Sequence, residues 1–164
     1  MQYNHLLTAT VTSLVIASVS IGDTESSTKA MNQMRITHPS LTTMEQFGNT
    51  RKLYDKELAT GNSPIESAEA FIDLWSEALD VDASEFIERG PFLDQHVEQQ
   101  LMYVPETGEH KFTGVYYMQT AGGLPVYGTR LMVLVRNIDG YPAVSATTDL
   151  RDVKWNKAPA RLFQ

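Results

Sequence analysis

Histidines and carboxylates are the side chains through which this chain could do acid–base or metal chemistry. The four histidines are scattered along the sequence, at His5, His38, His96 and His110. None of them forms the His-Glu-x-x-His pattern that places two zinc ligands on one face of a helix. The Gly-x-Ser-x-Gly turn of serine hydrolases and the glycine loops that bind phosphate are also missing. The sequence therefore predicts a protein that is not an enzyme and that holds no metal or cofactor.

The closely spaced carboxylates have a simpler interpretation than catalysis. The pairs Glu66/Glu69 and Asp73/Glu77 fall on the outer face of a predicted helix, where they favour solubility rather than acid–base chemistry. The net charge of −7 argues against nucleic acid as a partner, because phosphates attract clusters of Lys and Arg. The chain has no cysteine, so it forms no disulfide and uses no thiolate.

Three consecutive strands with tight connections are predicted between Phe112 and Leu150. From residue 126 to 135 apolar side chains alternate, which places Leu131, Val133 and Val135 on the face expected to form the core. The Asp139-Gly140 pair then predicts a hairpin turn, and alternation resumes after it. Upstream, residues 112–119 are rich in Val, Tyr and Phe, which favour strands. This pattern predicts an antiparallel meander.

A helix of about fifteen residues is predicted to begin at Ser63-Pro64. Ser63 suits the N-cap, Pro64 suits the first turn, and Glu66 has the position of a capping-box acid. One apolar stripe follows at spacings of three and four, so Trp75 is expected in the core. The members of the stripe are Ile65, Ala68, Ile72, Trp75 and Leu79.

These elements predict an α+β fold in which one main helix packs on an antiparallel sheet of about four strands. The α+β domain is expected to span residues 62–152 and to be preceded by a flexible lead-in at 23–61, which forms a mobile N-terminal arm. A basic tail occupies residues 153–164.

Residues 1–22 resemble a signal peptide, because residues 6–21 are uncharged and largely apolar and are followed by a polar stretch. This apolar run is short for a membrane span. The residues before it contain no Lys or Arg, so a disordered or helical N-terminal arm of a cytosolic protein is the alternative. We expect a secreted or periplasmic protein with no stable membrane span.

One motif within the meander resembles a known family. Its residues are Gln119, Gly123, Leu124, Pro125, Val126 and Gly128. Followed by a long apolar strand and an Asp-Gly hairpin, the motif is similar to the core of the fungalysin/thermolysin propeptide domain, which belongs to the prosegments of secreted zinc metallopeptidases. The resemblance extends over residues 65–152. The sequence departs from the family pattern at Tyr116, where a basic residue is usual, and at residues 146–148, where a glycine is usual.

The resemblance implies a non-catalytic exported domain that binds a thermolysin-like zinc metallopeptidase, as an inhibitor or as a folding assistant. The motif residues would then be mainly structural. Basic and aromatic side chains near the end of the chain are candidate partner contacts: Arg130, Arg136, Lys154, Trp155 and Arg161. A free sheet edge is a further candidate, because a partner strand could add to it. Arg130 and Arg136 could face a partner or could lie under the acidic helix.

Two alternatives remain open at this point. The first is a small exported module that binds a peptide, cell wall or lipid ligand, and the second is a degenerate remnant of a longer precursor. Tyrosines gathered on an open concave face would favour the ligand-binding module, and tyrosines packed under the helix would favour the partner-binding domain. The residues concerned are Tyr116, Tyr117, Tyr127 and Tyr141.

Overall fold

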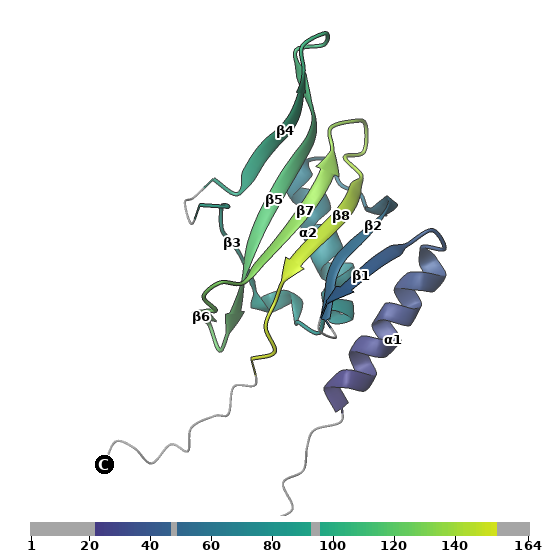
Figure 1. The fold of residues 1–164 in the computed structure, drawn as a ribbon, viewed down its shortest axis with the longest axis vertical. Coiled ribbons are helices and arrows are strands. Elements are labelled where there is room, and N and C mark those ends of the chain that lie inside the picture. Colours follow the sequence, from purple (N-terminus) through teal and green to yellow (C-terminus); the bar gives the residue numbers. More distant parts are fainter. Residues whose placement is uncertain (1–21, 47–48, 93–95, 154–164) are drawn as a thin grey trace, which may run out of the picture.

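The fold is built on one antiparallel sheet of eight strands. The computed structural model describes residues 22–46, 49–92 and 96–153. The strands follow the order β1-β2-β8-β7-β5-β3, and β4 and β6 also pair with β5 (Figure 1). Their bounds are β1 Thr42–Gln46, β2 Asn49–Ala59, β3 Phe86–Glu88, β4 Glu98–Val104, β5 Glu109–Ala121, β6 Leu124–Pro125, β7 Arg130–Arg136 and β8 Ala143–Asp149.

The predicted meander is confirmed as β5, β7 and β8, which pair antiparallel in sequence order. Leu131, Val133 and Val135 are fully buried, as their alternation predicted. Extended back to Tyr127, the same alternation would place this residue on the core face, but Tyr127 lies before β7 and is 85% exposed. The long β5 is bordered on its other side by β4 and then β3, so these two short strands lie end to end along it.

The predicted helix is α2, Pro64–Trp75, and it is followed by a 3-10 turn, η1, at Ser76–Leu79. The Ser63 hydroxyl accepts a hydrogen bond from the Glu66 amide at 3.2 Å, which caps the first turn. The Glu66 carboxylate accepts from the Asn62 amide at 3.0 Å, rather than from the amide of the cap residue. Trp75 lies in the core, and its indole N–H donates to the Leu58 carbonyl at 2.9 Å.

The expectation of one main helix on about four strands, with a mobile N-terminal arm, is wrong. Residues assigned to that arm form a second helix, α1 at Gly22–Thr37, and the strands β1 and β2. β2 lies beside β8 within the sheet, and α1 packs against η1 and α2. Leu53 and Leu58 are both buried, although strict alternation would put residues five apart on opposite faces. A register shift between Tyr54 and Ala59 allows both to reach the core, and it hides the strand period.

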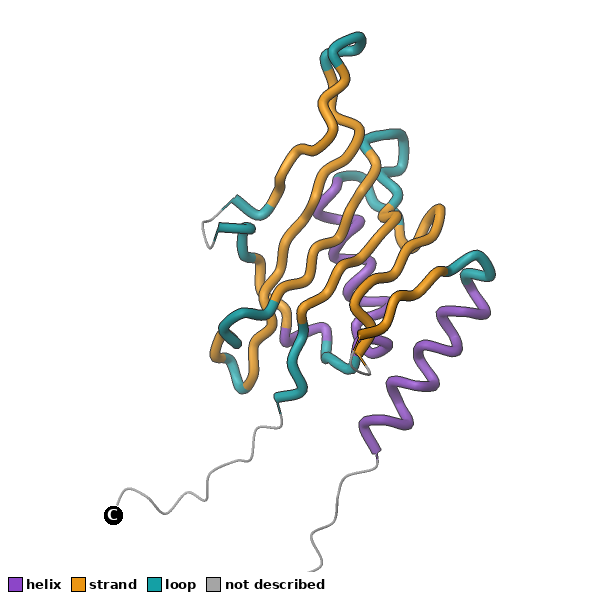
Figure 2. The backbone as a smooth tube through the Cα atoms, viewed as in Figure 1, coloured by secondary structure: helices purple, strands orange, loops and turns teal. Residues whose placement is uncertain are grey.

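Helices cover one face of the sheet. α2 contacts β2, β5, β7 and β8, and the core between them includes Phe71, Val115 and Leu131. None of the described helices lies over the opposite face. α2 lies on the first face, and α1 runs beside β1 at the edge of the sheet (Figures 1 and 2). We call this second face the open face. Among the described residues, no helix is long and apolar enough to cross a membrane. A short 3-10 turn, η2 at Ala83–Glu85, leads into β3.

Candidate partner-binding site

The motif forms a tight connection between β5 and β7. Gly122 and Gly123 have φ values of 57° and 80°, a left-handed conformation that turns the chain out of β5. The Val126 amide then donates to the Gln119 carbonyl at 2.8 Å. The Thr129 hydroxyl donates to the Val126 carbonyl at 2.7 Å and accepts from the Gln119 amide at 3.2 Å. The loop is therefore closed on itself by backbone geometry and one threonine.

Gln119 uses its side chain to hold the chain where it leaves the sheet. Its Nε2 donates to the Arg151 carbonyl at 3.0 Å, and its Oε1 accepts from the Arg151 amide at 3.0 Å. The side-chain amide thus pairs with Arg151 as a backbone peptide of a neighbouring strand would. Gln119 is buried, so these two bonds are shielded from water. We call this pair of bonds the Gln119 clamp.

Gly128 contacts the same residue. A Cβ atom on Gly128 would lie 3.1 Å from Nη2 of Arg151, so the arginine side chain passes close to the glycine backbone. The φ of Gly128 is 75°, which also favours glycine. Two positions of the motif therefore converge on Arg151, a residue outside the motif that lies two positions after β8.

The other motif residues shape the loop. Pro125 pairs with Thr120 in the two-residue strand β6, where its missing amide hydrogen is tolerated. Leu124 is 59% exposed, and Val126 is half-buried. A Cβ atom on Gly123 would have no atom within 4 Å, so this glycine is present for its backbone conformation alone.

The predicted partner contacts fall into two groups. Arg130 and Arg136 are both exposed, on the face of β7 opposite Leu131 and Val133. Since α2 packs on the Leu131 side, these arginines do not lie under the acidic helix. An Arg130 nitrogen lies 3.8 Å from the Asp149 carboxylate. The remaining three, Lys154, Trp155 and Arg161, lie outside the described residues.

The open face carries exposed and half-buried side chains around these arginines. Met44 and Tyr54 are exposed on β1 and β2, and the Lys52 Nζ lies 6.0 Å from the centre of the Tyr54 ring. Met132 and Leu134 are half-buried on β7. A protein partner commonly covers a surface that combines aromatic, methionine and basic side chains in this way.

The four tyrosines do not gather at one place. Tyr117 is buried in the core under α2, whereas Tyr116 precedes it on β5 and is buried on the opposite face. The Tyr116 hydroxyl donates to Oε1 of Gln99 at 2.8 Å. Tyr127 is exposed beside the motif loop, and Tyr141 is half-buried near the β7–β8 turn. The arrangement therefore offers no aromatic platform for a ligand.

The motif is the sequence feature that indicated Gln119 and Gly128. The family resemblance rests on the same motif. No protein-family model matches the chain, and no curated protein or solved structure matches it either.

Proposed function

We propose that the chain is a non-catalytic exported domain that binds a thermolysin-like zinc metallopeptidase, as an inhibitor or as a folding assistant. The Gln119 clamp is the observation that carries this proposal. The motif on which the family resemblance rests fixes the backbone at Arg151, where the chain passes from the sheet towards the basic tail. A domain that presents a following segment to a partner needs such a fixed point of exit.

The open face supplies the area that such a partner would cover. Tyr54 and Met44 are exposed there, and Arg130 and Arg136 add positive charge on the same side of the sheet. The outer face of α2, by contrast, carries Glu66, Glu69 and Asp73. In this proposal the peptidase binds against the open face, and the covered face keeps the domain folded.

Inhibition of thermolysin by the purified chain tests the proposal. We expect peptidase activity to fall as the chain is added, or the refolding yield of the denatured peptidase to rise. Tyr54→Asp should weaken the effect by tenfold or more, because it replaces an exposed aromatic side chain of the open face with a charge. Leu74→Asp is the matched control, since Leu74 is 59% exposed on α2 and lies away from that face. A chain that binds no peptidase and changes neither activity nor refolding yield contradicts the proposal.

A further inference from the structure

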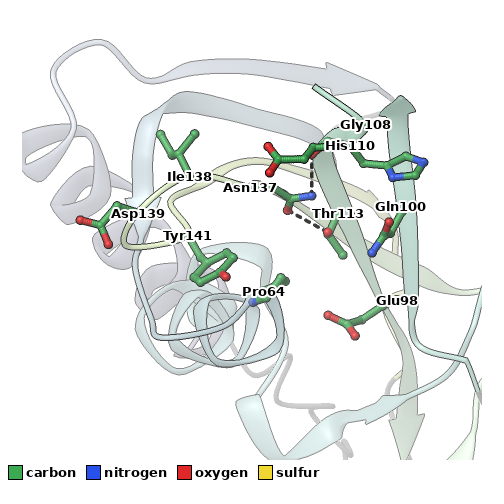
Figure 3. A pocket seen from close by; sticks show the side chains of 11 residues that line it. Pro64, Glu98, Gln100, Gly108, His110, Thr113, Asn137, Ile138, Asp139 and Tyr141 are labelled. Atoms are coloured by element: carbon green, nitrogen blue, oxygen red, sulfur yellow. Dashed lines mark hydrogen bonds between the residues drawn. The ribbon is translucent and has the colours of Figure 1, made fainter. Parts of the chain in front are cut away.

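A concave region lies on the helix-covered side of the sheet, away from the open face. It is a cleft of about 720 Å³ between the β4–β5 hairpin, the turn after β7 and the start of α2. Figure 3 shows Glu98 and Gln100 of β4 on one side of this cleft and Pro64 and Tyr141 on the other. We call it the acidic cleft.

The charge of the acidic cleft has one sign. Glu98, Glu109 and Asp139 line it, and the described part of the chain contributes no lysine or arginine to the lining. Elsewhere in the described residues, ion pairs involve the carboxylates of Glu45, Asp55 and Asp149, and Asp149 lies 3.0 Å from Arg51. Among the described residues, none of the three cleft carboxylates takes part in an ion pair. Carboxylates grouped in a cleft without a compensating cation favour a cationic occupant.

The register of the sheet places a further glutamate along β5, outside the cleft lining. Glu88 of β3 is opposite Tyr117, and Glu98 of β4 is opposite Val115. Both pairs lie on the face that α2 covers, because Val115 and Tyr117 belong to the core beneath it. The two glutamates are therefore two strand positions apart along one edge of the sheet, a separation of about 7 Å.

Tyr117 adds an independent observation. Its side chain is 4% exposed, and its hydroxyl has no hydrogen-bond partner within the described part of the chain. Burial and the nearby carboxylates of Glu69, Glu88 and Glu98 raise the pKa of the phenol, so it stays neutral. These three glutamates come from α2, β3 and β4, so three elements bring negative charge near the phenol. A buried polar group without a partner needs an explanation.

The wall of the cleft is held in place before any ligand arrives. The Thr113 hydroxyl donates to Oδ1 of Asn137 at 2.8 Å, and Nδ2 of Asn137 donates to the His110 carbonyl at 2.9 Å (Figure 3). The Asn137 amide also donates to the Lys111 carbonyl at 2.9 Å. These bonds join the β7–β8 turn to β5, so a ligand would meet a preorganised surface.

We propose that the acidic cleft binds lysine or arginine side chains of an extended peptide. Among the described strands β4 pairs with β5 alone, so its outer edge can accept the backbone of an added strand. Alternate side chains of an extended peptide are about 7 Å apart, which matches the spacing of Glu88 and Glu98. The acidic side chains follow the edge of the sheet, and among the described residues no three His, Asp or Glu gather as a metal site. The inference is independent of the metallopeptidase proposal.

The test is a titration of the full chain with the fluorescent peptide acetyl-Lys-Ala-Lys-Ala-Lys-amide, followed by anisotropy. We expect saturable binding that weakens as salt is added. Glu98→Gln should weaken binding by tenfold or more, because Glu98 lines the cleft and also lies near the phenol of Tyr117. Glu57→Gln is the control, since it removes an exposed carboxylate from β2 and changes the net charge equally. It should change binding by less than twofold.

Three outcomes would overturn the proposal. The first is the absence of saturable binding at low salt, and the second is an equal loss of affinity in Glu98→Gln and Glu57→Gln, which would indicate attraction to the overall negative charge. The third is competition by spermidine at the same concentration as the peptide, which would indicate a small polycation site without recognition of a backbone. Both variants replace exposed carboxylates, and their circular dichroism should match that of the wild type.

Discussion

The two faces of the sheet are made from alternate residues of the same strands, yet they differ in what lies over them. On β7, Leu131, Val133 and Val135 are fully buried against the helix side, while Met132 and Leu134 between them are half-buried on the open face. The helix side holds the fold together through apolar burial. The open face keeps apolar and basic side chains accessible, so it can serve recognition without weakening the core.

The largest effect should come from truncating the same residue type on each face. Leu131→Ala removes a fully buried side chain and should reduce the free energy of unfolding by about 2–5 kcal/mol. Leu134→Ala, three residues along the same strand, should cost about 1 kcal/mol or less. Urea denaturation measures both. Equal losses would mean that the open face is covered in solution and that the comparison fails.

The Gln119 clamp should have the next largest effect. Gln119→Ala removes both bonds to Arg151 and should lower stability by about 1–2 kcal/mol. Hydrogen exchange at the Arg151 amide, measured by NMR, should accelerate because its acceptor is lost. Gln100→Ala, an exposed glutamine on β4, is the control and should leave that amide unchanged. If the Arg151 amide exchanges equally fast in the wild type and in Gln119→Ala, the clamp does not form in solution.

The packing of α1 on the helix-covered side should weaken at acidic pH. Burial opposes ionisation of Asp55, but hydrogen bonds from Ser40 and the Lys56 amide, with the nearby charges of His38 and Lys56, lower its pKa overall. A folded-state pKa below the unfolded value contributes stability above the unfolded pKa, and this contribution is lost as the pH falls through the folded pKa. The midpoint temperature of unfolding should therefore decrease as the pH is lowered below about 4.

Asp55→Asn should flatten that acid dependence, because it removes the titrating group. Since His38 follows α1 and packs edge-on against Trp75 at 5.3 Å, loosening this contact should affect the helix side first. Glu57→Gln, on the same strand, is the charge-matched control. An Asp55→Asn profile identical to that of the wild type would contradict this interpretation.

The smallest effect should separate two glycines of the motif loop. Gly123→Ala and Gly128→Ala both place a Cβ atom at positive φ, at a cost of about 1–2 kcal/mol each. Gly128→Ala should cost a few tenths of a kcal/mol more, because its Cβ would approach the Arg151 guanidinium, whereas Gly123 has open space around it. Urea midpoints of the two variants would show the difference, and a costlier Gly123→Ala would contradict the contact with Arg151.

Sequence patterns predicted the parts of the fold that follow a simple period. The alternation around Leu131 and the Ser63-Pro64 cap predicted β7 and α2, because local spacing decides these elements. β2 was missed, since its register shift buries both Leu53 and Leu58 and breaks the period of two. α1 was missed because few of its side chains reach the core, Met34 most completely.

The candidate sites, too, were predicted only where a local sequence pattern carries them. The motif identified Gln119, but its partner Arg151 binds through backbone atoms, which carry no residue signature. The acidic cleft brings Glu98 and Glu109 from neighbouring strands to Asp139 in a distant turn. No spacing along the chain predicts that grouping, because the pairing of β4 with β5 and of β5 with β7 creates it.

The Gln119 clamp also has a mechanical consequence. β8 and β5 are not neighbours, because β7 lies between them. A pull on the chain beyond Arg151 is therefore resisted first by two hydrogen bonds to β5 and only then by the ladders of β8 with β2 and β7. A force applied at this end of the sheet is therefore divided between β5 and β8 before either strand separates from its neighbours.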